Sequence, residues 1–574
     1  MRPRPAHRIA IALLSVPLLI TACTGGEEPA EPEPVVWAEH TVRDEAPPPL
    51  AEEGPTAGRF ADSWQRPITV SGHSWFALAG GNVIVGTDER ISALEGETGE
   101  DSWSYREPGR RIGSWAATAD TIVVSTTGAI DNKHVSRLIG LDAGTGEFLW
   151  EKRERLRPDP PTAHAGLLAM LGGTDNHSVI VATDDNFRKH GIDARTGEVL
   201  WNLSANDLPQ GCELPAEDGS DSSGELLMLT VDCSGNGSDG TVYGAVEAET
   251  GKPRWFIGNQ PGELFAARKG TSVRFAPHEP PALIDRKGEE FFSAEDRATC
   301  PCAILDRDGS TLLSYRGQTE DRHSLVGRLV DVDENGDAKP FAKLPESFHN
   351  ATSTSDKLYG IALARPEINK FARRPVPAPL LLSTVGKEGK VEHSTLPTAV
   401  ASGTGVGWFT AAGDRIFLVM HREDGDAVIR SFDHTDDSAA PGGVDADAWP
   451  DSCELLSVPG LRDQEPYSPA GKEIRIGDVS MPKASCIGRT DRRDDVVLDV
   501  VWVAHDEGEA EKLFTEMAAE TDSPAGADQE HHDEAGNVWL RVGSVIVRFS
   551  PDELGEGQRD DVLHGIVTNL RELS

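Results

Sequence analysis

The chain has 574 residues, of which 95 are Asp or Glu and 55 are Lys or Arg, so its formal net charge at pH 7 is −40. Such acidity disfavours nucleic acid and anionic lipid surfaces as binding partners. The acidic residues are dispersed along the chain, which is typical of a solvated surface rather than of one dedicated cation site.

The N-terminus has the pattern of a secretion signal. Arg2, Arg4 and Arg8 precede an apolar stretch, Ile9–Ile20, which is too short to span a bilayer. The stretch ends in Ile-Thr-Ala-Cys23, which resembles the bacterial lipobox, where cleavage before the Cys accompanies its lipidation. We therefore predict a signal peptide at 1–22 and a lipid anchor on Cys23, with fatty acyl groups such as palmitate. The alternative is an ordinary secreted protein with an odd cysteine.

The segment that follows is poor in apolar residues. It is rich in Pro, Glu and Gly up to Gly58, a composition that favours an extended, self-repelling chain. We predict that 23–58 is a disordered tether that holds the rest of the protein away from the membrane.

Four copies of one phrase follow in the first half of the chain. Each has an apolar residue, three polar or small residues, Thr-Gly, three further residues and Trp. The copies run over Leu94–Trp103, Leu141–Trp150, Ile192–Trp201 and Val246–Trp255. A phrase repeated at steps of 47, 51 and 54 residues is typical of a radial array of small β-sheets.

The parts of the phrase have separate mechanical roles. The glycine permits positive φ in a turn between two strands. The indole of the tryptophan is expected to pack between neighbouring sheets, with its N–H on a backbone carbonyl. The expected turn and docking residues are Gly99, Trp103, Gly146, Trp150, Gly197, Trp201, Gly251 and Trp255.

This phrase resembles the tryptophan-docking repeat of the pyrroloquinoline-quinone (PQQ)-like β-propellers. The resemblance implies an all-β fold, and many propellers with the repeat bind no quinone. Degenerate copies of the repeat continue to about residue 440. We therefore predict an eight-bladed β-propeller over 59–440.

The eighth blade lacks a clear fourth strand. The segment Asp62–Gln65 resembles Asp101–Ser104, the fourth strand of the first blade, but no earlier strands of its own precede it. We predict that this segment completes blade eight, because joining the chain ends removes an edge that would otherwise aggregate.

The cysteines indicate an oxidising compartment. Seven are present, and Cys23 is assigned to the lipid. Six remain for disulfides, paired in sequence order. The Cys300–Cys302 pair is the uncertain one, and a redox role for it is the alternative. The expected pairs are Cys212 with Cys233, Cys300 with Cys302, and Cys453 with Cys486.

The region 450–574 follows a Pro-Gly-Gly linker and has a different pattern. We predict a strand at Val496–Val503, a helix at Glu509–Glu520, a hairpin at Val538–Phe549 and a closing helix that begins at Ser550–Glu553. The pattern resembles small extracellular α+β domains of actinobacterial lipoproteins and kinase sensor regions. It implies binding or sensing, without catalytic residues.

Two short segments resemble metal sites. Asp331–Asp337 begins like an EF-hand loop but has Ala342 at position twelve and no flanking helices. His531–Glu534 lies in a polar loop. We expect a turn in the first case and a solvated loop in the second. No nucleophile elbow, zinc-protease motif or P-loop is present in the sequence.

The sequence thus favours a non-enzymatic, lipid-anchored scaffold, binding or sensing protein at the extracytoplasmic face of the cell membrane. We expect no cofactor and no metal, a monomer, and an unidentified surface or envelope protein as partner. The alternative is a PQQ-dependent quinoprotein dehydrogenase, which would hold PQQ and Ca²⁺. A third interpretation, by analogy, is the propeller lipoprotein of the outer-membrane assembly machine.

Overall fold

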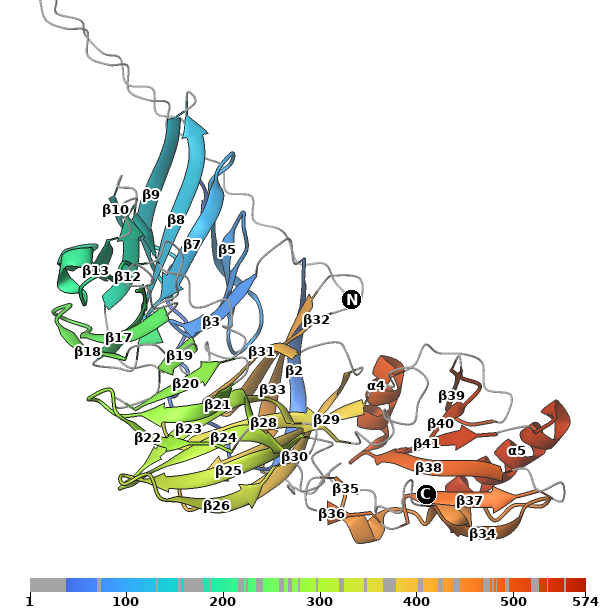
Figure 1. Cartoon of the computed structure of the whole chain (residues 1–574). Coiled ribbons are helices and arrows are strands. Elements are labelled where there is room, and N and C mark those ends of the chain that lie inside the picture. Colours follow the sequence, from blue (N-terminus) through green and yellow to red (C-terminus); the bar gives the residue numbers. More distant parts are fainter. Residues whose placement is uncertain are drawn as a thin grey trace, which may run out of the picture. The chain divides into compact units, whose positions relative to one another are not determined.

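A computed structural model gives the fold of residues 38–573 (Figure 1). The described residues belong to one compact unit, Ala38–Ser574. None of the helices described in it is long and apolar enough to cross a membrane. The description leaves out 70–73, 131–132, 153–155, 159–178, 185–187, 215–220, 223–225, 234–240, 258–262, 267–270, 277–278, 296–297, 319–324, 345–347, 365–377, 401–405, 422–426, 437–443, 468–474, 477–478, 482, 491–494, 518–525, 534 and 552–553.

Four antiparallel sheets contain the four repeated phrases, and we number them 1 to 4 in chain order. In each, consecutive strands lie side by side, and sheet 1 has an added edge strand, β1 (Glu39–Thr41). The strands are β3 (Trp75–Ala79), β4 (Asn82–Gly86), β5 (Ile91–Glu95), β6 (Asp101–Arg106), β7 (Arg111–Ala117), β8 (Thr121–Ile130), β9 (Lys133–Asp142), β10 (Phe148–Lys152), β11 (Leu156–Pro158), β12 (Val179–Asp184), β13 (Lys189–Asp193), β14 (Val199–Leu203), β15 (Asp221–Ser222), β16 (Leu226–Asp232), β17 (Thr241–Glu247) and β18 (Pro253–Ile257).

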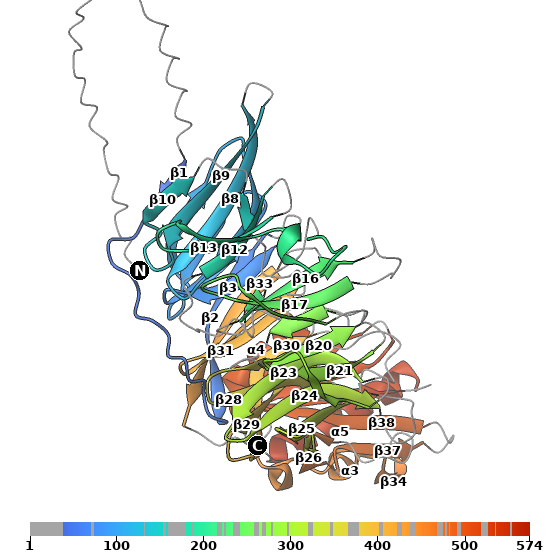
Figure 2. The ribbon, with the colours of Figure 1, turned by 60° about the vertical axis from the view of Figure 1, so that its left-hand side comes forward.

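Four more four-stranded sheets, 5 to 8, follow the same pattern without the complete phrase (Figure 2). In every sheet we call the strands A to D, in the order in which they are hydrogen-bonded. The strands are β19 (Glu263–Ala266), β20 (Ser272–Ala276), β21 (Glu279–Ile284), β22 (Glu290–Ser293), β23 (Thr299–Arg307), β24 (Ser310–Gln318), β25 (Leu325–Asp333), β26 (Ala338–Lys343), β27 (Phe348–Ser353), β28 (Lys357–Leu363), β29 (Ala378–Gly386), β30 (Val391–Val400), β31 (Val406–Ala412), β32 (Arg415–His421) and β33 (Ala427–Thr435).

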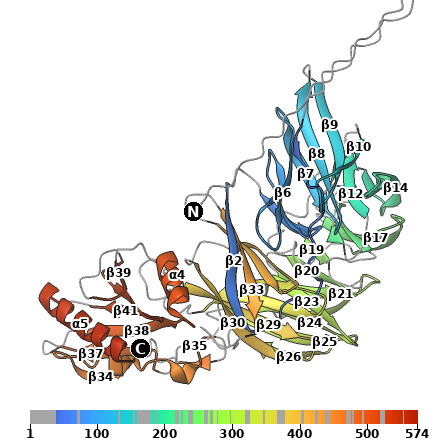
Figure 3. The ribbon, with the colours of Figure 1, turned by 180° about the vertical axis from the view of Figure 1, so that it is seen from behind.

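Strand D of sheet 8 comes from the other end of the chain. It is β2 (Arg59–Ile68), which pairs antiparallel with β33 from Arg59 opposite Thr435 to Ile68 opposite Ala427. The two strands run side by side in Figure 3. This pairing confirms the prediction that the segment around Asp62–Gln65 completes the last sheet.

The hydrophobic core consists of clusters that each draw side chains from two consecutive sheets. The last of them joins sheet 8 back to sheet 1 through Phe417 and Val85. These clusters contain many fully buried β-branched, leucine and aromatic side chains on the strand faces, as expected for stacked sheets. The other junctions contain Trp103 with Ile139, Leu138 with Ile192, Val181 with Leu229, Met228 with Ile284, Leu283 with Leu313, Leu312 with Leu358, and Leu382 with Ile416.

The prediction of a disordered tether is wrong for residues 38–58. Backbone groups of this segment bond to a turn of sheet 8 and to a strand side chain of sheet 7: Ala51 O accepts from Gly413 N at 2.9 Å, and Pro55 O accepts from the Tyr359 hydroxyl at 2.8 Å. A segment with few apolar side chains is held here by its main chain, which composition does not reveal. Residues 23–37 lie outside the described part of the chain.

The C-terminal region forms a six-stranded antiparallel sheet with three helices around one core. Asp506 Oδ1 accepts from Glu509 N at 2.9 Å, so an N-cap starts α4 two residues earlier than expected. The closing helix begins later than expected, because Ser550 still belongs to a strand. The elements are α3 (Ser452–Leu455), β34 (Arg462–Pro466), β37 (Ser485–Arg489), β38 (Asp495–Val503), α4 (Glu507–Met517), β39 (Gln529–His532), β40 (Val538–Val542), β41 (Val545–Ser550) and α5 (Glu556–Leu573), with a separate pair, β35 (Arg475–Ile476) and β36 (Val479–Ser480).

Candidate functional site

The Thr-Gly phrase folds into the same C–D turn in each of sheets 1 to 4. In sheet 2, Asp142 O accepts from Gly146 N at 2.8 Å, and Asp142 N donates to Glu147 O at 2.8 Å. The Asp142 carboxylate also accepts from the backbone N–H and the hydroxyl of Thr145. Gly146 has φ +73°, which a side chain would disfavour. The phrase is therefore a complete turn motif, whose side chains bond to its own backbone.

Each tryptophan of the phrase packs on the turn of the next sheet. The indole Nε1 of Trp103 donates to Ala143 O at 2.9 Å, and a Cβ on Gly146 would lie 2.6 Å from its ring. In the same way Trp150 donates to Ala194 O at 2.8 Å, and Trp201 donates to Ala248 O at 2.7 Å. The glycines thus serve both turn and docking: they have positive φ, and they leave room for the indole.

The ladder of docking contacts starts one sheet earlier than the four phrases indicate. Trp64 in β2 donates to Gly96 O at 3.0 Å, and its ring lies against Gly99. Sheet 8 is therefore attached to sheet 1 by the same contact that joins sheets 1 and 2.

The contact changes at sheet 5. Trp255 packs on Gly288, but the turn is one residue shorter, with Asp285 N bonded to Glu289 O. In the described part of the structure the buried Nε1 of Trp255 has no hydrogen-bond partner. In the C–D turn of sheet 6, Gly336 packs against the backbone of Phe291. In that of sheet 7, Gly389 packs against the ring of Phe341. The indole hydrogen bond therefore belongs to the longer turn.

A buried carboxylate lies at the junction of sheets 1 and 2. Glu107, 2% exposed, follows β6 and accepts from the hydroxyls of Tyr105 and Thr126. Arg137 Nη1 lies 3.1 Å from Glu107 Oε1, and Arg137 also pairs with Glu151 at 2.7 Å. Burial and the bond to Glu107 raise the pKa of Tyr105 well above its usual value. The pKa of Arg137 is raised, and the largest cause is its hydrogen bond to Glu151.

The junction of sheets 5 and 6 repeats this arrangement. Glu295 follows β22 and accepts from the Tyr315 hydroxyl, and its Oε1 lies 3.0 Å from Arg328 Nε. Burial raises the pKa of Tyr315, and Glu295 raises it further. In both junctions an acid after strand D binds a cross-strand pair of the next sheet: Thr126 with Arg137, and Tyr315 with Arg328.

Sequence reasoning did not single out these junction residues. The available signal was a Glu shortly after strand D, together with an Arg five residues before the Asp that opens the next C–D turn. Arg137 precedes Asp142 by five residues, and Arg328 precedes Asp333 by five. Two copies separated by four sheets are hard to recognise without the pairing register.

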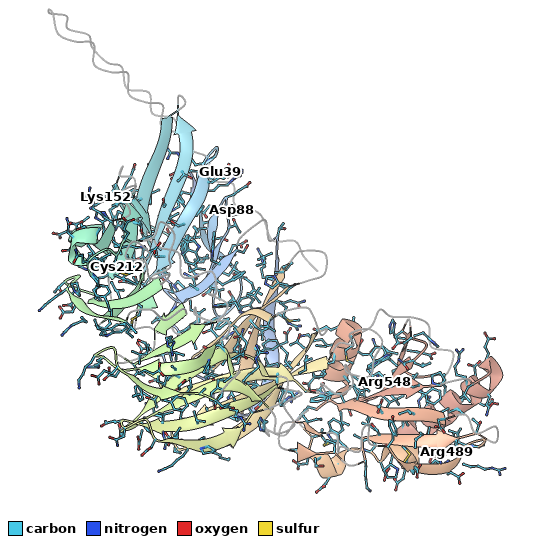
Figure 4. All side chains as sticks on the ribbon, in the orientation of Figure 1. Glu39, Asp88, Lys152, Cys212, Arg489 and Arg548 are labelled. Atoms are coloured by element: carbon cyan, nitrogen blue, oxygen red, sulfur yellow. A yellow bond between two sulfur atoms is a disulfide. The ribbon has the colours of Figure 1, made fainter. Side chains whose placement is uncertain are left out.

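The C-terminal sheet has a buried ion pair of its own. Asp499 on β38, 4% exposed, accepts from Arg548 on β41 at 2.6 Å and from the Ser485 hydroxyl. The guanidinium of Arg548, labelled in Figure 4, lies 5.9 Å from the centre of the Trp539 ring. The charges of Asp499 and Arg548 compensate one another inside the sheet.

All three expected disulfides are present: Cys212–Cys233, Cys300–Cys302 and Cys453–Cys486. The second lies within β23, and both of its cysteines are more than 90% buried. The third ties α3 to β37. Cys23, the expected lipid site, lies outside the described residues.

In both segments that resemble metal sites, an aspartate accepts hydrogen bonds from nearby residues. Asp333 accepts from the backbone N–H of Asn335 and Asp337 in the turn between β25 and β26. The prediction of a loop is wrong for His531 and His532, which lie in β39 and pair with β40. Asp533 accepts from Asn537 and from the indole of Trp539. Glu534 is outside the described residues, and within them no group of three or more His, Cys, Asp or Glu side chains is placed to hold a metal.

Comparison with known proteins supports the fold. The family described as outer membrane protein assembly factor BamB matches residues 50–268, less than half of the chain. No curated protein matches.

Among solved structures, BamB from Moraxella catarrhalis is 13% identical and covers 65% of this chain and 99% of its own, with a TM-score of 0.38. A quinohemoprotein alcohol dehydrogenase from Pseudomonas putida HK5 is 12% identical over 69% of this chain and 78% of its own, with a TM-score of 0.38. A europium-containing methanol dehydrogenase is 12% identical over 66% and 93%, with a TM-score of 0.37. The repeated phrases, the sheets that they join and the family match over 50–268 together support a β-propeller built from PQQ-like repeats.

Proposed function

We propose that this chain is a lipid-anchored, eight-bladed β-propeller followed by an α+β domain at 450–574. It resides at the extracytoplasmic face of the cell membrane, binds a surface or envelope protein and catalyses no reaction. The propeller would act as a rigid frame whose loops carry the partner.

The pairing of the cysteines carries this proposal. All six cysteines after residue 23 are in disulfides, which favours an oxidising compartment outside the cytoplasm. Cys23, which lies outside the described residues, is the cysteine of the sequence that these three pairs leave over. It is also the residue that the lipobox assigns to the lipid.

The packing between sheets supports a closed ring of eight blades. Hydrophobic clusters join each sheet to the next, and one further cluster joins sheet 8 to sheet 1. Trp64 docks across that same junction. Closure of this kind leaves only short protected edges, as in other propellers.

The anchor is tested by replacing Cys23 with Ser in the full-length chain, with Thr24→Ala as the matched control. We expect wild type and control in the membrane fraction as cleaved, lipid-modified chains. The C23S variant should be released or remain an uncleaved precursor. A C23S variant that fractionates and matures like wild type would contradict the proposal.

The binding role is tested by photo-crosslinking in intact cells. A photoreactive amino acid at Glu89, beside Asp88 in the B–C turn of sheet 1 (Figure 4), samples one end of the sheets. The same group at Arg195, in the C–D turn of sheet 3, samples the other end. We expect a discrete adduct from one position and not from the other.

The quinoprotein alternative predicts a different result. Purified protein would show a quinone absorption band and alcohol oxidation after addition of PQQ and Ca²⁺. That result, together with the absence of adducts from both positions, would replace the binding role by the enzymatic one.

A further inference from the structure

One charged cluster connects the N-terminal strand β2, sheet 8 and helix α4 of the C-terminal region. Arg430 on β33, strand C of sheet 8, has a side chain that is 4% exposed. Its Nη1 donates to Glu516 Oε1 at 2.7 Å and to the Thr398 hydroxyl at 2.6 Å. Its Nη2 donates to Asp62 Oδ1 at 2.8 Å. Glu516 belongs to α4, and Asp62 to β2, so three distant segments share one guanidinium.

The position of Glu516 matches that of Glu107 and Glu295. Those two residues follow strand D of one sheet and bind an arginine on strand C of the next. Glu516 Oε2 accepts from Ala399 N at 3.0 Å, at the end of β30, which is strand D of sheet 7. It binds Arg430 on strand C of sheet 8, so it occupies the same place at the next-to-last junction.

The connection between sheets 7 and 8 cannot supply such a carboxylate. Residues 401–405 read Ala-Ser-Gly-Thr-Gly in the sequence. An arginine buried here without a partner would be costly, because a charge removed from water needs compensation. The C-terminal region provides the acid that the local connection lacks.

Two further pairs connect α4 and its N-terminus to the N-terminal strand. Lys512 forms an ion pair with Asp62, and Asp506 pairs with Arg59 at 2.8 Å. Acid and base alternate along Glu516, Arg430, Asp62 and Lys512, so each charge has an opposite neighbour. Ala399 and Leu381 of sheet 7 also belong to the hydrophobic cluster of the C-terminal region.

We propose that α4 is a clasp for the composite sheet: it holds the N-terminal strand β2 in sheet 8 and sheet 8 against sheet 7. Glu516 and Lys512 act as positioning residues for Arg430 and Asp62. The C-terminal region is then part of the propeller frame. This role is independent of the lipid anchor and of the binding partner proposed above.

Hydrogen exchange on the full-length protein tests the clasp. Glu516→Gln removes the charge with little change of shape, and Glu511→Gln removes a charge from the exposed side of the same helix. We expect E516Q to speed exchange in β2 and β33 about fivefold to tenfold, the effect of weakening a partly exposed ion pair within a network. Exchange in β16 and β17 of sheet 4 should be unchanged, and E511Q should behave like wild type.

A double-mutant cycle separates the clasp from a general loss of stability. Lys512→Met and Asp62→Asn are made singly and together, and exchange in β2 is compared. A shared effect, in which the second substitution adds little to the first, supports the clasp. Unchanged exchange in β2 and β33 in E516Q, or an equal increase in sheet 4, would overturn it.

Discussion

The first half of the propeller and its closing half are held together in different ways. Sheets 1 to 4 are joined by one device used repeatedly, an indole that donates to the turn of the next sheet. Sheets 7 and 8 instead recruit distant parts of the chain: residues 51–55, strand β2 and α4. The first device is visible in the sequence, whereas the second depends on residues hundreds of positions apart.

This difference shows that a repeated phrase in the sequence marks only the sheets that are joined by the contact it encodes. The phrase can be recognised in the sequence because the docking of the indole needs the turn length, the glycine and the tryptophan together. At sheet 5 the turn is one residue shorter and the indole has no acceptor among the described residues. At the later turns Gly336 contacts the backbone of Phe291, and Gly389 contacts the ring of Phe341. The family match accordingly ends at residue 268, although the sheets continue.

The largest effect should come from removing the closing strand. Deleting residues 24–68 takes away β2, exposes the edge of β33 and leaves Arg430 without Asp62. We expect aggregation, because a long unpaired edge strand pairs with other chains. Deleting only 24–37 should leave the melting temperature unchanged. Equal light scattering from the two proteins would show that β2 is dispensable.

Truncating a docking tryptophan should have the next largest effect. Trp103 is 2% exposed and packs on Gly146. Trp103→Ala should lower the free energy of unfolding by about 3–5 kcal/mol, as for other buried tryptophans. Trp150→Ala should lower the free energy of unfolding by less, because Trp150 is less buried. Chemical denaturation measures both, and a loss below about 1 kcal/mol for W103A, typical of surface substitutions, would mean that docking is not needed.

A smaller effect is expected at the turn glycine. Gly146→Ala introduces a side chain at φ +73° and places it 2.6 Å from the indole of Trp103. Gly309→Ala has the same backbone requirement, at φ +77°, but no atom within 4 Å. G309A should cost about 1 kcal/mol from backbone strain alone. G146A should cost clearly more, and equal losses would show that the indole moves aside freely.

The smallest effect isolates the indole hydrogen bond. Trp103→Phe removes a donor that bonds to Ala143 O, whereas Trp255→Phe removes one without an acceptor among the described residues. W103F should therefore destabilise by about 1 kcal/mol more than W255F, the usual net value of one hydrogen bond. If the two variants lose the same free energy, the difference between the long and short turns has no energetic meaning.

Much of the fold follows from local pattern. Turn glycines and alternating strands place nearly every sheet, and the resemblance of Asp62–Gln65 to a fourth strand identifies the pairing with β33. The hairpin of β40 and β41 is likewise legible in the sequence. These elements depend on contacts within one repeat, or on one contact that recurs between successive repeats.

The remainder depends on where distant segments meet. The docked course of residues 38–58 is missed because it is held by backbone carbonyls such as Pro55 O. The roles of Glu107 and Glu516 are missed because an isolated Glu in an acidic chain carries no signal until its arginine is located. Ser550 shows the same limit: its helix-start pattern is overridden by strand pairing with Val497.

The composite sheet also imposes an order on synthesis. Arg59 and Thr435 meet in sheet 8 although 376 residues separate them. At roughly 5–20 residues per second, β2 waits about 20–75 s after it is made before its partner strand exists. A chain that terminates early retains an unpaired strand bearing Phe60 and Trp64, which is a ready substrate for chaperones and proteases. The pairing of β2 with β33 therefore distinguishes chains that extend past residue 435 from chains that stop before it.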